Sequence, residues 1–257
     1  MNKEYLIFHW EDEWRAMFRL AFILFGNAVL LYSLTCTNVN AQTKEHTDQI
    51  WLAGQVVYNT KSNFIINGEL EYQGEYQSEN DWKNWIAGVE VGYLLIPTLE
   101  LRGELKGLLT NENDTLSRKE LRPVLSAKWD FLNRGRFILY DHLKFEWRQL
   151  YFSSSELNSG SLRVRNKLGM IMALTQKSPT MNKSLNLLVS LEAFLVEQDN
   201  ERERFSNRIR LECGLSYRLS DQWKLIMSYY RQHSRNQIEE SFSSHENILS
   251  LKATYYL

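Results

Sequence analysis

From about residue 49 onward, apolar and polar side chains alternate with a period of two, and this alternation recurs in one segment after another. The stretch RIRLECGLSYR is a clear case, because Ile209 and Leu211 alternate with Arg210 and Glu212. A β-strand projects successive side chains to opposite faces, so each segment has one apolar face and one face rich in charge. The alternation therefore predicts an all-β protein whose strands separate two different environments.

These segments are also long. About eleven can be counted, most of them ten to fifteen residues in length, whereas strands of soluble proteins cluster near five or six residues. A tilted strand needs roughly nine to eleven residues to cross a bilayer, and closure into a barrel pairs every backbone group without leaving an edge. The lengths therefore favour an antiparallel, up-and-down transmembrane β-barrel.

The connections between the segments alternate in size, as they do in outer-membrane barrels. Compact turns are expected at residues 59–63, 96–97, 133–135 and 220–221, and longer polar loops near residues 110–117, 152–160 and 234–244.

The strand number is expected to be about 10 to 12, with 12 favoured, because single-chain bacterial barrels usually have an even number. Either one further strand gives twelve, or the segment that contains Trp51 does not cross and the number is ten.

The first forty residues carry an export pattern. Met17–Leu34 is an apolar run with one basic residue, Arg19, near its start, and small residues follow up to Ala41. A charged start, an apolar run and a small-residue cleavage site are the parts of a signal peptide. We therefore predict a signal peptide at residues 1–41 and an outer-membrane barrel at residues 42–257.

Other interpretations of this segment remain open. The stretch before Met17 is acidic, which indicates that translation starts at Met17. The apolar run is also about long enough to remain as a membrane anchor. The residues before Cys36 fit a lipoprotein signal poorly, so lipidation is not expected. In each case the remainder of the chain is exported.

A soluble β-sandwich would show the same alternation with its apolar faces turned inward, so other features must decide between the two. The export pattern, the strand lengths and the aromatic residues near strand ends all favour an apolar face that meets lipid. The expected lipid-interface aromatics are Trp85, Trp129, Trp147, Tyr217, Trp223 and Tyr255.

The chain ends on its last strand, where Leu249, Leu251, Tyr255 and Leu257 share one face. This strand is similar to the C-terminal recognition strand of bacterial outer-membrane proteins, although its last residue is leucine where an aromatic is usual. The similarity implies that the barrel-assembly machinery is a partner. Outer-membrane lipids are the other expected partner.

The polar faces carry both signs of charge, as expected for a lumen filled by paired side chains. A barrel of this size lies between those filled by side chains and those with open channels, so a narrow or plugged lumen is expected. The arginines form a stripe that would attract anions, unless facing glutamates neutralise it. The predicted lumen network consists of Glu69, Glu71, Glu90, Glu100, Arg102, Glu104, Lys128, His142, Lys144, Glu146, Arg163, Arg165, Glu192, Arg208, Arg210, Glu212 and Arg218.

Three polar residues, Asp141, Asn166 and Asn207, fall on the apolar face. The two asparagines are expected near the long-loop end, where a polar group costs little. A charged side chain such as that of Asp141 is expected on the apolar face only if it lies near the short-turn interface.

Two stretches are distinctive: the opening QIWLAGQVVYN, and RIRLECGLSYRLSDQWKLIMSYYRQ, which is followed by a polar loop and a last strand. In these stretches the chain, from about residue 49 to residue 257, resembles a family of bacterial outer-membrane proteins known as domain of unknown function 2490 (DUF2490). The resemblance implies a β-barrel and leaves the function open, because these motifs carry no known catalytic residues.

Few residues indicate chemistry. His142 could act as the base of a lipid hydrolase or acyltransferase, but a histidine within a lumen ion network is the favoured interpretation. His233 and His245 flank a loop with Glu239, Glu240 and Glu246, where a solvated loop is favoured over a metal site. No metal or cofactor is therefore expected, and the formal net charge of -1 gives no indication of a nucleic-acid partner.

The function expected from the sequence is a non-enzymatic barrel of the bacterial outer membrane, acting as a narrow channel or a surface scaffold. A lipid-modifying enzyme and a soluble periplasmic β-protein are the alternatives.

Overall fold

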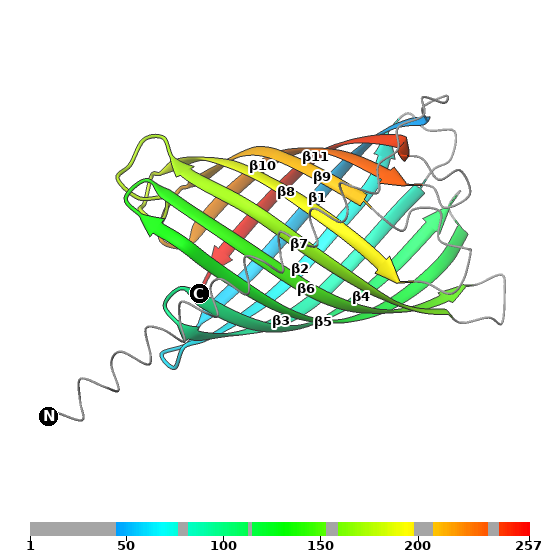
Figure 1. The fold of residues 1–257 in the computed structure, drawn as a ribbon, viewed down its shortest axis with the longest axis horizontal. Coiled ribbons are helices and arrows are strands. Elements are labelled where there is room, and N and C mark those ends of the chain that lie inside the picture. The colour runs from blue at the N-terminus through cyan, green and yellow to red at the C-terminus, as the bar shows by residue number, and fades with distance from the viewer. Residues whose placement is uncertain (1–44, 77–81, 113–114, 153–158, 198–207, 236–241) are drawn as a thin grey trace, which may run out of the picture.

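In a computed structural model, residues 45–76, 82–112, 115–152, 159–197, 208–235 and 242–257 are described. They form eleven strands that close into a barrel (Figure 1). The strands are β1 (Glu45–Asn59), β2 (Phe64–Tyr76), β3 (Trp82–Ile96), β4 (Leu99–Glu112), β5 (Thr115–Arg134), β6 (Phe137–Phe152), β7 (Ser159–Ala173), β8 (Leu185–Glu197), β9 (Arg208–Arg218), β10 (Trp223–Arg235) and β11 (Phe242–Tyr256).

Consecutive strands are antiparallel neighbours, and the barrel is closed by β1 and β11, which run parallel. In this closing pair Ile50 lies opposite Leu249 and Val56 opposite Tyr255. The predicted up-and-down barrel and the range of 10 to 12 strands are confirmed. The favoured number of twelve is wrong, and so is the interpretation in which the Trp51 segment does not cross, because that segment is β1.

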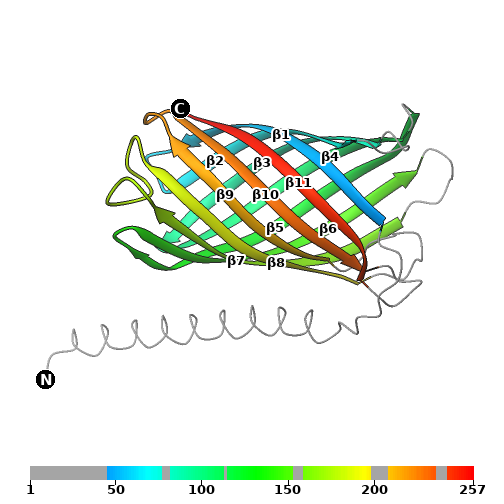
Figure 2. The same cartoon turned by 90° about the horizontal axis from the view of Figure 1, so that it is seen from above.

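An odd number of strands places the start of β1 and the end of β11 at opposite ends of the barrel (Figures 1 and 2). The end that holds Leu257 also holds the connections after β1, β3, β5, β7 and β9, and we call it the short-turn end. The other end, where β1 starts, is called the long-loop end.

The β1–β2 turn shows how local chemistry sets a tight connection. The Thr60 hydroxyl accepts hydrogen bonds from the backbone N–H groups of Ser62 and Phe64, and Asn63 has a φ of 59°. Asparagine tolerates this left-handed conformation better than most residues. In the β5–β6 turn Gly135 has a φ of 57°, which glycine adopts without a steric penalty.

Two connections differ from expectation. Most of the predicted loop at residues 110–117 is strand, because β4 continues to Glu112 and β5 begins at Thr115. The connection of residues 174–184 between β7 and β8 is long, although it lies at the short-turn end. It is held in place because Asn182 donates to the Asp221 carboxylate at 2.7 Å and inward-facing Asn186 donates to the Pro179 carbonyl.

The wall has its apolar side outside. The outward rows expose large hydrophobic side chains, with exposed fractions of 67% for Leu70, 60% for Val89 and 56% for Leu125. The inward rows bury charged and amide groups, and only 2% of Glu146 and 1% of Gln232 are exposed. A water-soluble domain has the opposite distribution.

Two of the three polar exceptions on the outward face lie side by side. Asn166 of β7 donates a hydrogen bond of 2.7 Å to the Asp141 carboxylate of β6. Asn166 occupies the middle of its strand rather than the long-loop end, so its expected position is wrong. The side-chain amide of Asn166 finds its hydrogen-bond partner in Asp141 and not in polar groups at the long-loop end. The third exception, Asn207, lies outside the described residues.

This pair generates a stability prediction. Asn166→Leu removes the side-chain donor to Asp141 and is expected to lower the free energy of unfolding by about 1–3 kcal/mol, because a polar group on the apolar wall loses its partner. Urea unfolding of the protein in lipid vesicles, followed by tryptophan fluorescence, measures the change.

The double variant Asp141→Leu/Asn166→Leu is the control, since it removes both polar groups together. It is expected to recover most of the loss. Equal destabilisation by the single and the double variant would contradict a specific pair.

Candidate functional site in the barrel lumen

All of the predicted lumen residues lie on inward rows of the barrel. The alternation of each strand puts them there, and the closure of the barrel brings their side chains together from distant parts of the chain. Most of them form ion pairs, which fall into groups at different levels of the lumen.

The first group lies toward the long-loop end and is centred on Glu120 of β5. Arg148 of β6 binds this carboxylate with two nitrogens, at 2.7 and 3.0 Å, and Arg122 approaches it at 2.7 Å. All three side chains are buried. A carboxylate held by two guanidinium groups is a strong, charge-assisted contact, which fixes the position of all three side chains.

A second group joins four strands. Glu146 of β6 accepts from Arg163 and Arg165 of β7, at 2.6 and 2.7 Å. Arg165 also donates to Glu192 of β8 at 2.7 Å, and Glu192 lies 3.5 Å from Arg210 of β9. Carboxylates and guanidinium groups therefore alternate across this part of the lumen.

Arg210 is enclosed by aromatic rings as well as by polar partners. Its guanidinium group lies 4.9 Å from the ring centroids of Trp51 and Phe194 and 5.5 Å from that of Tyr230. It also donates to the Gln232 side-chain carbonyl at 2.8 Å. Rings on three strands thus hold one cation by cation–π attraction while its N–H groups remain bonded.

Hydrogen bonds continue from this cation to the seam where the barrel closes. Gln232 of β10 donates to Glu246 of β11 at 2.8 Å, and Gln49 of β1 donates to the same carboxylate at 3.1 Å. Side chains therefore support the parallel β1–β11 pairing from inside the barrel.

The middle of the lumen contains smaller groups. Lys167 lies 2.7 Å from Glu212, whose carboxylate also accepts from Ser190 and Ser228. Glu69 pairs with both Lys252 and Lys106. Lys106 also pairs with Glu104. Pairs closer to the short-turn end are Arg102 with Glu90 and Glu100, and Lys128 with Asp130.

Not every predicted lumen residue takes part in an ion pair with another described side chain. His142 is buried, its Nε2 atom has no hydrogen-bond partner, and its cross-strand neighbours are Lys128 and Lys167. Lys144 forms no ion pair with the described residues. A nucleophile, base and orienting acid need mutual hydrogen bonds, and the contacts of His142 within the described residues include no such arrangement.

Several residues of the network were not anticipated. Trp51 and Phe194 are apolar residues on inward rows, and their role depends on a cation that belongs to another strand. Lys224 and Lys252 lie in segments whose alternation indicates an inward position, but the partner of Lys252 is Glu69 of the distant strand β2. Only the register of the closed barrel shows which charges meet.

The expected interface aromatics lie on outward rows near both ends. Large fractions of Trp85, Trp147, Tyr217 and Trp223 are exposed. Trp223 packs against Tyr255 with a ring distance of 4.9 Å at the short-turn end, and Tyr72 packs against Trp85 at 4.8 Å at the long-loop end. Trp129 also lies on an outward row, but it is buried and packs against Phe131.

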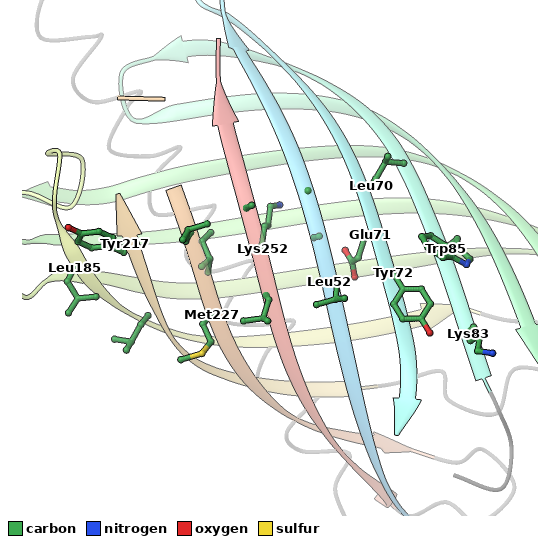
Figure 3. A pocket seen from close by; sticks show the side chains of 17 residues that line it. Leu52, Leu70, Glu71, Tyr72, Lys83, Trp85, Leu185, Tyr217, Met227 and Lys252 are labelled. Atoms are coloured by element: carbon green, nitrogen blue, oxygen red, sulfur yellow. The ribbon is translucent and has the colours of Figure 1, made fainter. Parts of the chain in front are cut away.

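A shallow apolar groove of about 1040 Å³ crosses the outer wall where β1 meets β11 (Figure 3). Two small residues of its lining, Gly54 and Ala253, face each other across the seam. Leucine and methionine side chains flank it on both sides, and Tyr72, Lys83 and Trp85 form one edge. The flanking side chains on the outward rows are Leu52, Leu70, Leu215, Leu225, Met227 and Leu251.

His233 and His245 lie opposite each other on β10 and β11, whereas Glu239 and Glu240 are outside the described residues. Across the described strands and turns, no group of three or more histidine, cysteine, aspartate and glutamate side chains is placed to hold a metal. The described residues also contain no helix that is long and apolar enough to cross a membrane. The predicted signal peptide and Cys36 lie outside the described residues.

Comparison with known proteins assigns the chain to a family. No curated protein matches the sequence. The family model described as a protein of unknown function, DUF2490, matches residues 48–242, which include most of the barrel and of the lumen network. The chain therefore belongs to the DUF2490 family.

Proposed function

We propose that this protein is an integral, non-enzymatic barrel of the bacterial outer membrane, a scaffold with a closed lumen rather than an open pore. The observation that carries the proposal is the inverted wall, in which leucines and aromatics are exposed outside and ion pairs are buried inside. In lipid the outward rows are stabilised by the acyl chains, and the charges remain shielded from them.

Three further features support a membrane setting. The strands are 11 to 20 residues long, enough for a tilted crossing. The barrel has no unpaired edge. Aromatic pairs occupy outward positions near both ends, as an interfacial girdle requires. Acyl chains would also fill the apolar groove at the β1–β11 seam.

The closed lumen is inferred from how its inward side chains pack. Toward the long-loop end the buried residues include Leu150, Ile248 and Phe194 together with the ion pairs of Glu120 and Glu146. Such a filled interior leaves little room for a solute. The surroundings of His142 favour a non-enzymatic role over lipid hydrolysis, because its cross-strand neighbours are lysines rather than a nucleophile and an acid.

The barrel is expected to have its short-turn end in the periplasm, as outer-membrane barrels do. Because the number of strands is odd, the start of β1 at Glu45 then lies at the cell surface, while Leu257 lies on the periplasmic side.

If the outward rows face lipid, the destabilisation caused by a charged residue on them should depend on its depth in the membrane. Leu105→Arg, in the middle of the outward row of β4, is expected to destabilise the inserted barrel by about 2–4 kcal/mol and to reduce its amount in the outer membrane. Quantitative immunoblots of fractionated envelopes measure that amount.

Leu132→Arg is the matched control for Leu105→Arg, because the same change near a short turn should cost only about 0–1 kcal/mol. In a soluble protein both exposed leucines would tolerate arginine equally. Recovery of wild-type and Leu105→Arg protein alike in the soluble fraction, without detergent, would refute the membrane assignment.

The closed lumen predicts low conductance. In planar bilayers the refolded protein should give at most small current steps, far below those of an open porin, because side chains occupy the permeation path. Arg210→Ala removes the cation that Trp51, Phe194 and Tyr230 surround, and it should increase both the frequency and the size of the steps. Large, steady, ohmic steps from the wild-type protein would rule out a closed scaffold.

The odd strand number predicts the topology of the N-terminal end. An epitope tag placed directly before Glu45 should be accessible to antibody on intact cells. The same tag inserted at Lys61, in the β1–β2 turn, should become accessible only after the outer membrane is permeabilised. The opposite pattern of labelling would show that the orientation is reversed.

A further inference from the structure

Two cations face each other at the short-turn end of the lumen. Arg218, the last residue of β9, lies directly opposite Lys224 near the start of β10, and both are on inward rows. Like charges that are direct cross-strand partners destabilise a sheet. Two other pairs of cations, Lys106 with Arg122 and Lys144 with Arg165, are also direct cross-strand partners, but each contains a cation that contacts a carboxylate. The pair of Arg218 and Lys224 has no such contact within the described residues.

Within the described residues, no carboxylate forms an ion pair with either of these two cations. The charged groups that act on Lys224 are Arg218, Lys128 and Lys252, which are all cations. One terminal nitrogen of Arg218 donates to the backbone carbonyl of Asp221, and its Nε atom is buried without a hydrogen-bond partner. The Asp221 carboxylate is instead bonded to Asn182.

The two neighbouring cations are already balanced. Lys128 lies 2.9 Å from Asp130, and Lys252 pairs with Glu69. The uncompensated positive charge at this level therefore belongs to Arg218 and Lys224, which are both half-buried. Thr254 lies opposite Lys224 and adds a hydroxyl group to the same region.

The position of Arg218 is also restricted. Its guanidinium group lies 4.9 Å from the ring centroid of Tyr256, which holds one face of the group while its edge carries the free Nε–H. A guanidinium group oriented in this way presents donors in the fork geometry that suits an oxyanion. Lys224 can supply a second charge from the adjacent strand.

From these observations we infer that the short-turn end of the lumen binds a small oxyanion, of the phosphate or carboxylate class, between Arg218 and Lys224. The anion supplies the counter-charge that the protein lacks there and occupies the donors that its own groups leave free. It enters from the short-turn side, because packed ion pairs fill the long-loop half. The site goes beyond the proposed scaffold role and does not depend on the membrane location.

Titration calorimetry of the refolded protein in zwitterionic detergent, with inorganic phosphate as the probe, tests the site. Wild-type protein should bind phosphate, and Lys224→Met should weaken the binding at least tenfold. Lys224→Arg keeps the charge and should retain most of the binding. Lys61→Met is the matched control, because it makes the same change in an exposed turn at the same end of the barrel. A parallel titration with acetate distinguishes a phosphate site from a carboxylate site.

A second measurement tests the site even if the Lys224→Met variant does not fold. Phosphate should raise the urea midpoint of wild type, Lys224→Arg and Lys61→Met, and it should leave the midpoint of Arg218→Gln nearly unchanged. Absence of both phosphate and acetate binding by wild type, or equal binding by Lys224→Met and Lys61→Met, would overturn the inference. The experiment uses detergent-solubilised protein, so its outcome is separate from the test of the outer-membrane location.

Discussion

The structure depends on the pairing of β1 with β11, because this contact removes the only two strand edges that the sheet would otherwise have. In a hydrocarbon environment an unpaired backbone N–H or C=O costs several kcal/mol, so an open sheet of this length would not be stable there. A parallel ladder is slightly weaker per residue than an antiparallel one. The hydrogen bonds of Gln49 and Gln232 to Glu246 add side-chain support at this weaker seam.

Closure also determines how the charged face of each strand is accommodated. An isolated strand such as β7 would expose Arg163 and Arg165 to whatever surrounds it, whereas the barrel brings Glu146 and Glu192 against them. Pairs of this kind are specific in geometry, but desolvation offsets much of their attraction. The lumen is therefore best understood as a polar core that holds its strands in register. Arg218 and Lys224 depart from this pattern because they are adjacent cations that form no ion pair within the described residues, which is why they indicate a ligand.

The sequence predicted the parts of this structure that depend on a single strand. Side-chain alternation is a local property, so the all-β class, the two faces and the inward position of residues such as Glu146 and Arg210 followed from the period of two. The strand number did not follow, because parity is a property of the closed sheet, and an even number was expected where a parallel β1–β11 pair is present. The partners of Arg210 were also not predictable, since Trp51, Phe194 and Tyr230 come from three other strands. Likewise, the expected alternation of short and long connections does not predict a long β7–β8 connection at the short-turn end.

The parallel seam has a further consequence for how the chain reaches this structure. Antiparallel neighbours are consecutive along the chain, whereas the bond from Gln49 to Glu246 spans 197 residues. A loop about ten times longer than a hairpin costs roughly 2 kcal/mol more in closure entropy. The order of events follows from this difference, because ten hairpin contacts can form locally before the first and last strands meet. The final step is then a single long-range closure, and until it occurs both β1 and β11 present a free edge to any other strand.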